Sequence, residues 1–131
     1  MDERRVQIRM LIVESDATTV DTILSALRAF DLRSTVAGRA ADARRIVARA
    51  PTDVAVVGTV LPDGSGFDLL DDLRRAPNGP PVILHGAADA AHDVLRGWRA
   101  GAVDYLLRPL SAAELRASVL RATRQSHPIV A

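Results

Sequence analysis

Residues 54–73, VAVVGTVLPDGSGFDLLDDL, decide the fold class of this chain. Residues 54–57 form a short apolar run, which predicts a strand buried on both faces of a sheet. Residues 61–66 are dense in turn-forming residues, so we expect a loop there. Apolar side chains then follow at helical spacing over residues 67–73. A buried strand, a loop and a helix in this order are typical of one unit of an α/β protein.

The same alternation continues on both sides of this stretch. Further strands are predicted at residues 10–13, 34–37, 82–84 and 103–107. Further helices are predicted at residues 20–30, 43–50, 89–100 and 111–122. Five strand–helix units without an internal repeat predict a flavodoxin-like (βα)5 fold. In this fold a doubly wound parallel sheet has the strand order 2-1-3-4-5.

Length and composition indicate one domain with an aliphatic core. We expect the domain at residues 9–125, with short tails at 1–8 and 126–131. Aromatic residues make up only 3% of the 131 residues, and there are no cysteines, which excludes disulfides and thiol catalysis. All 17 basic residues are arginines, and the net charge of +1 gives no support for direct nucleic-acid binding. No apolar run reaches membrane-spanning length, so we expect a cytoplasmic protein without membrane contact.

The carboxyl ends of the strands are where ligands bind in doubly wound sheets. Polar or small residues gather in these places. They are Glu14, Ser15 and Asp16 after the first strand, Gly58 after the third, His85 and Gly86 after the fourth, and Arg108 and Pro109 after the fifth.

These residues occur within segments that resemble the receiver domains of response regulators. Residues 13–16 resemble the acidic segment after the first strand of that family, and residues 61–70 resemble its loop and third helix. Residues 100–106, followed by Arg108-Pro109, resemble its fifth strand and Lys-Pro pair. The resemblance covers residues 8–125 and implies a signalling module of a two-component system.

The resemblance also implies phosphoryl transfer to an aspartate at the end of the third strand. In such receivers three carboxylates hold Mg²⁺, and a lysine helps to neutralise the phosphoryl group. A hydroxyl after the fourth strand binds that group, and an aromatic residue on the fifth strand follows the movement.

This chain departs from the family pattern at most of these positions. The phosphoacceptor position, four residues before the loop proline, is Gly58, which has no nucleophile. Ser15 replaces a metal carboxylate, Gly86 replaces the hydroxyl residue, and Arg108 replaces the lysine. The residues that still fit the family pattern are Glu14, Asp16, Tyr105 and Pro109.

Alternatives remain open for the remaining charged residues. Glu14 and Asp16 are weak candidates for a metal site; otherwise Asp16 caps the first helix and Glu14 is solvated. Arg108 either binds an anion in space left by the glycines or forms an ion pair with Glu14 or Asp16. Hydrolase chemistry is not expected, because adjacent strand positions face opposite ways, so His85 and Gly86 do not both line the site.

We therefore expect a non-enzymatic receiver-like module that needs no cofactor and acts through protein contact without phosphorylation. The partner, or a second copy of the chain, is expected to bind the fourth helix, fifth strand and fifth helix through Trp98, Arg99 and Tyr105. The alternative for Trp98 is packing at the rim of the core. Two alternative functions are a small-ligand or anion sensor near Arg108, and the receiver part of a transcription regulator whose DNA-binding domain lies outside this chain.

Overall fold

A five-stranded parallel sheet forms the centre of the computed structural model, which describes residues 7–87 and 91–126. Its strands are β1 (Ile8–Val13), β2 (Leu32–Ala37), β3 (Val54–Gly58), β6 (Val82–Gly86) and β7 (Asp104–Leu107). They lie in the order β2-β1-β3-β6-β7, all parallel, which confirms the predicted topology.

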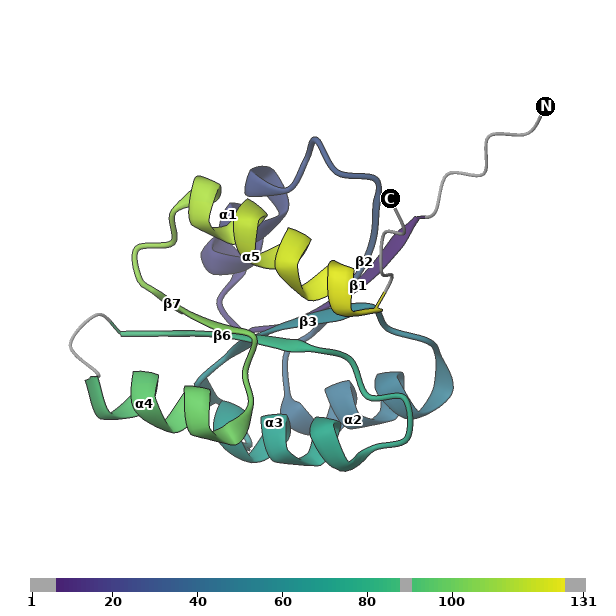
Figure 1. Ribbon diagram of the computed structural model, residues 1–131, viewed down its shortest axis with the longest axis vertical. Coiled ribbons are helices and arrows are strands. Elements are labelled where there is room, and N and C mark those ends of the chain that lie inside the picture. The colour runs from purple at the N-terminus through teal and green to yellow at the C-terminus, as the bar shows by residue number, and fades with distance from the viewer. Residues whose placement is uncertain (1–6, 88–90, 127–131) are drawn as a thin grey trace.

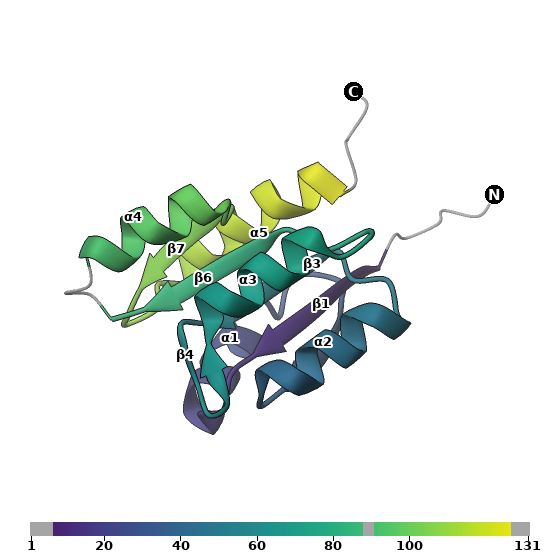
Figure 2. The same ribbon diagram turned by 90° about the horizontal axis from the view of Figure 1, so that it is seen from below.

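Five helices cover the two faces of the sheet (Figures 1 and 2). Helices α1 (Ala17–Ala26) and α5 (Ala112–Ser126) lie on one face and contact each other. Helices α2 (Ala40–Arg49), α3 (Gly66–Arg75) and α4 (Ala91–Ala100) lie side by side on the other face. No helix among the described residues has the length and apolar character that crossing a membrane requires.

Side-chain alternation along the strands divides the core into two clusters, one on each face of the sheet. The cluster under α1 and α5 contains Ile12, Val56 and Ile83, whereas the cluster under α2, α3 and α4 contains Val13, Val57 and Leu84. Strand β3 is buried along its whole length, as expected for a central parallel strand.

Two details of the fold differ from the prediction. The loop at residues 61–66 contains a two-stranded antiparallel sheet, made of β4 (Val60–Leu61) and β5 (Gly64–Ser65). Helix α1 ends at Ala26, although the apolar spacing continues to Phe30. Phe30 lies in the turn that follows the helix and packs against the core from there.

The predicted domain boundaries, 9–125, lie within one residue of the start of β1 at Ile8 and of the end of α5 at Ser126. The tails at 1–6 and 127–131, and the expected helix start at Asp89, lie outside the described residues.

Candidate functional site

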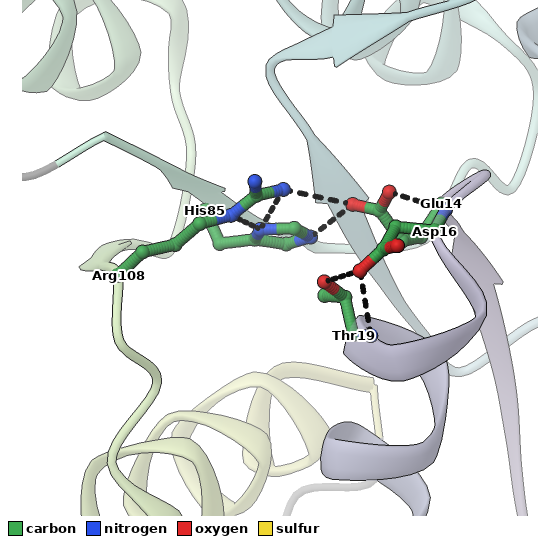
Figure 3. Close-up of polar contacts among 5 residues, drawn as sticks. All are labelled: Glu14, Asp16, Thr19, His85 and Arg108. Atoms are coloured by element: carbon green, nitrogen blue, oxygen red, sulfur yellow. Dashed lines mark hydrogen bonds and ion pairs between the residues drawn. The ribbon is translucent and has the colours of Figure 1, made fainter.

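Glu14, His85 and Arg108 meet at the carboxyl ends of β1, β6 and β7 (Figure 3). Arg108 donates a hydrogen bond from Nη2 to Glu14 Oε1 at 3.0 Å, and this bond spans 94 residues of sequence. The Arg108 Nε and Nη2 atoms both lie 3.4 Å from His85 Nδ1. The predicted ion pair between Arg108 and a carboxylate of the first strand is therefore present, and its partner is Glu14.

Glu14 is a buried carboxylate, with only 4% of its surface exposed. Its Oε2 accepts a hydrogen bond from the backbone N–H of Asp16 at 2.9 Å, while its Oε1 faces Arg108. The expectation that Glu14 is a solvated side chain is wrong. Arg108 reaches over it from the loop after β7, and the guanidinium itself stays partly exposed.

His85 is named in the sequence analysis as a residue at a strand end, but its place beside Glu14 and Gly58 was not predicted. It is fully buried, and its Nε2 lies 3.3 Å from Glu14 Oε1. Its position in the site follows from register, because His85 pairs with Gly58 across β3 and β6. The signal in the sequence was a histidine directly after the apolar run 82–84. The run alone does not indicate on which face of the sheet the side chain of His85 lies.

A neutral His85 fits these contacts. A guanidinium can only donate hydrogen bonds, so Nδ1 facing Arg108 must be an acceptor, and the ring proton lies on Nε2 toward Glu14. Burial, together with the positive charge of Arg108, lowers the pKa of His85 to about 4.

Gly58 has no free space beside it. A Cβ atom built on Gly58 would lie 2.8 Å from Glu14 Oε1 and 3.3 Å from His85 Cε1. Thus Glu14 and His85 occupy the volume into which a side chain at position 58 would project.

Gly86 lies on the other face of the sheet and belongs to a different environment. A Cβ atom on Gly86 would lie 2.2 Å from the hydroxyl oxygen of Tyr105 and 2.8 Å from Thr59 Oγ1. The expectation that Gly58 and Gly86 together leave room beside Arg108 is therefore wrong. The groove that does include Arg108 has a volume of about 210 Å³ and lies outside the sheet, against Thr18, Thr19, Thr22, Pro109 and Leu110.

Asp16 caps α1, as one of the sequence alternatives predicts. Its carboxylate accepts hydrogen bonds from the Thr19 backbone N–H at 3.0 Å and from the Thr19 hydroxyl at 2.6 Å. These hydrogen bonds lower the pKa of Asp16, and the charge of Arg108 contributes in the same direction. Ser15 is exposed beside it, and the Arg108–Pro109 peptide bond is cis.

The residues proposed for the interaction face separate into exposed and buried ones. Trp98, 53% exposed, and the exposed Arg99 lie on α4, next to Leu95, which is 50% exposed. About half of the Trp98 surface is therefore accessible. Tyr105, by contrast, is only 7% exposed and lies beneath this face, so its inclusion as a contact residue needs correction.

Comparisons with known proteins agree on one family. The response regulator receiver domain model matches residues 10–120. The probable transcriptional regulatory protein TcrX of Mycobacterium tuberculosis is 35% identical over 82% of this chain and 46% of its own length. The sensory transduction protein RegX3 of Mycolicibacterium smegmatis is 34% identical over 88% of this chain and 50% of its own length. The chain therefore spans about half the length of these two relatives.

A solved structure agrees in fold along nearly the whole chain. The non-phosphorylated receiver domain of HemR from Leptospira biflexa matches with a TM-score of 0.80 and 26% sequence identity. The match covers 95% of this chain and 100% of that chain.

Proposed function

The chain belongs to the response regulator receiver domain family, and we propose that it is an atypical member that signals through protein contact without being phosphorylated. Receiver domains are signalling modules of two-component systems rather than classical enzymes. The proposal concerns how this particular module works when its phosphoacceptor position is glycine.

The environment of Gly58 is the observation that carries the proposal. Phosphoryl transfer to a receiver needs a carboxylate nucleophile, and glycine supplies none. The place of that carboxylate is taken by Glu14 and His85, which are both buried. Arg108 forms an ion pair with Glu14, so the negative charge of this carboxylate is balanced within the site.

The Mg²⁺ ion that the family uses does not fit the residues present. Mg²⁺ requires several oxygen ligands in octahedral geometry. Glu14 is engaged with Arg108, Asp16 caps α1, and Ser15 and Gly58 supply no carboxylate. Among the described residues, no three acidic or histidine side chains cluster in a way that could hold a metal ion.

The surface formed by α4, β7 and α5, here called the α4–β7–α5 face, is our candidate for the protein contact. Leu95 and Trp98 expose large apolar surfaces on α4, and Arg99 adds a charged anchor. Aromatic and arginine side chains are enriched at the centres of interfaces. Asp104 of β7 binds Ser118 and Arg121 of α5, which joins the two elements into one surface.

Sedimentation of a Trp98→Ala, Arg99→Glu double variant tests this face, with a second copy of the chain as the first partner. We expect the parent chain to self-associate and the double variant to sediment as a monomer. The matched control is Leu24→Ala, Arg28→Glu, which makes the same kind of change on an exposed surface of the α1 layer. Association that persists in the first variant and disappears in the control would place the interface on α1 instead.

Transcriptional control is a second candidate function, favoured by the description of TcrX as a probable transcriptional regulatory protein. Under this proposal the α4–β7–α5 face controls a DNA-binding domain outside this chain. Determining the reading frame beyond residues 1 and 131 tests it. A DNA-binding domain encoded there supports the proposal, and an output domain of another kind contradicts it.

A further inference from the structure

Strand β2 forms an open edge of the sheet. It pairs only with β1 and exposes residues 33–36, whereas β7, at the opposite edge, exposes one residue of its four. The carbonyl oxygens of Asp31 and Ala37 accept hydrogen bonds from β1. Because backbone groups alternate in direction along a strand, those of Ser34 and Val36 point away from the sheet. No strand of the described residues pairs with them there, so a further strand can bind to this edge.

The features that usually protect an edge strand are missing from β2. Its sequence, LRSTVA, contains no proline, and its register with β1 is continuous over six residue pairs, without a bulge. Val36 is 46% exposed and lies on the face of the sheet toward α1, since its partner in β1, Ile12, packs beneath α1 and α5. A strand added here therefore finds an apolar contact as well as backbone groups.

Arg33, the one charged residue of β2, lies next to a second arginine. Arg9 is directly opposite in the β1–β2 register, and like charges in this arrangement repel each other. Arg9 pairs with Asp53, whereas Arg33 forms no ion pair within residues 7–87 and 91–126. Both arginines line a groove of about 400 Å³ beside the C-terminal end of α2, and the lining contains no acidic residue. A carboxylate bound in this groove therefore offsets the repulsion.

We propose that the β2 edge binds an extended acidic segment of a partner protein, which adds a further strand to the sheet. Main-chain hydrogen bonds to Ser34 and Val36 hold the segment, and its side chains alternate between the two faces. Carboxylates on one face meet Arg33 in the groove, and apolar side chains on the other face meet Val36. A second copy of the chain fits less well, because its own β2 brings another arginine and no carboxylate.

Fluorescence anisotropy with short labelled peptides tests the charge part of the proposal. The probe is a peptide of alternating glutamate and valine, and its counterpart has lysine in place of each glutamate. We expect the parent chain to bind the glutamate peptide and not the lysine peptide. Arg33→Glu is expected to abolish this binding, because the new carboxylate pairs with Arg9 and repels the peptide.

The matched control is Arg75→Glu, which makes the same change on the exposed surface of α3, between α2 and α4. We expect it to bind the glutamate peptide as tightly as the parent. Equal binding of the two peptides, no binding of the glutamate peptide, or equal weakening by Arg33→Glu and Arg75→Glu would overturn the proposal.

Ser34→Pro tests the backbone part. Proline removes the outward N–H of this exposed residue and leaves the hydrogen bonds to β1, which use the residues on either side. We expect about tenfold weaker binding of the glutamate peptide, because one main-chain bond is lost and the added strand is interrupted. Ser34→Ala, which keeps the N–H, is the control. Binding that Ser34→Pro leaves unchanged would show that charge alone holds the peptide, which contradicts strand addition.

Hydrogen exchange of the parent chain covers the case in which Ser34→Pro does not fold. We expect saturating glutamate peptide to slow exchange at the Ser34 and Val36 amides several-fold. Unchanged exchange at both amides would overturn the proposal. Slow exchange that instead appears without peptide and grows with protein concentration would assign the edge to a second copy, which also overturns it. None of these measurements involves Trp98 or Arg99, so failure of the α4–β7–α5 face as a contact surface leaves them unaffected.

Discussion

His85 is kept neutral by its burial and by the positive charge of the neighbouring Arg108. Arg108 offers only donors to Nδ1. Nε2 lies 3.3 Å from Glu14 Oε1 but has no hydrogen-bond partner among the described residues. A second proton on the ring would face the guanidinium inside a buried environment. Burial and the charge of Arg108 therefore lower the pKa of His85 to about 4.

This low pKa predicts a loss of stability in mild acid. In the unfolded chain the histidine takes up a proton near its ordinary pKa of about 6.5, whereas the folded chain resists protonation until about pH 4. Protons therefore favour the unfolded state as the pH falls through this window. The contribution of His85 amounts to a loss of about 2 kcal/mol between pH 7 and pH 5.

Urea denaturation at pH 7 and pH 5 measures this contribution when the parent chain is compared with His85→Gln. Glutamine keeps polar atoms in the site but has no proton to gain in this range. We expect the parent to lose about 2 kcal/mol more than the variant over this interval. Equal losses in the two proteins would contradict the assignment of a neutral, buried His85.

Gly58→Asp tests whether the space at position 58 is truly filled. A Cβ atom there lies 2.8 Å from Glu14 Oε1, and the new carboxylate adds like charge to that crowding. Overpacking of a buried site costs about 1–3 kcal/mol, so we expect a loss of at least this size in urea denaturation. Gly38→Asp is the control in open space. Equal stability of the two variants would show that Glu14 moves aside easily.

The sequence allowed prediction of some contacts in the site but not of others. An ion pair of Arg108 with a carboxylate is one of the two sequence alternatives, because a cation and acidic residues lie at carboxyl ends of strands in the same parallel sheet. The place of His85 beside Gly58 was not predicted, because it depends on the register between β3 and β6. The burial of Glu14 was missed for a similar reason, since it depends on an arginine 94 residues away.

The N-terminal caps of α1 and α2 show the same contrast. A cap from an adjacent residue is predictable from the sequence, whereas a cap from a distant residue is not. Asp16 caps α1 from the adjacent position, so the cap was predictable from sequence. Helix α2 is capped by Asp63, which accepts hydrogen bonds from the backbone N–H groups of Ala40 and Ala41 at 2.8 and 3.0 Å. Asp63 lies in the turn between β4 and β5, and no local pattern links it to a helix 22 residues earlier.

Asp63→Ala is expected to loosen the first turn of α2. Its removal leaves the Ala40 and Ala41 donors without this acceptor. The same hydrogen bonds lower the pKa of Asp63. We predict a lower melting temperature and faster hydrogen exchange at these two amides. Asp31→Ala, which removes only a 3.4 Å contact with Gln7, is the control. Unchanged exchange at Ala40 and Ala41 would argue against a capping role for Asp63.

The strands themselves were predictable because four of them are apolar runs or alternating segments of ordinary length. Right-handed crossovers restrict the possible connections, and the flavodoxin-like arrangement of five strands predicts the order β2-β1-β3-β6-β7. The β4–β5 pair was not predicted, since Pro62, Asp63 and Gly64 are typical of an irregular loop.

The molecule as a whole has the receiver fold, and side chains from other strands fill the space beside Gly58 and Gly86. Gly58 and Gly86 lie on opposite faces of the sheet, and each is covered by side chains from other strands. Glu14 and His85 cover the first, and Tyr105 covers the second. We therefore propose that the fold needs no phosphoryl group at either of these two positions, and this is the central claim of our account.

Intact-mass measurement after incubation with acetyl phosphate and Mg²⁺ tests this claim most directly. A receiver domain with an aspartate at the phosphoacceptor position, treated in parallel, shows that the reagents are active. We predict that the mass of this chain stays unchanged, because Gly58 has no nucleophile and Glu14 is paired with Arg108. A stable, stoichiometric gain of one phosphoryl group on a carboxylate of this chain would contradict the account.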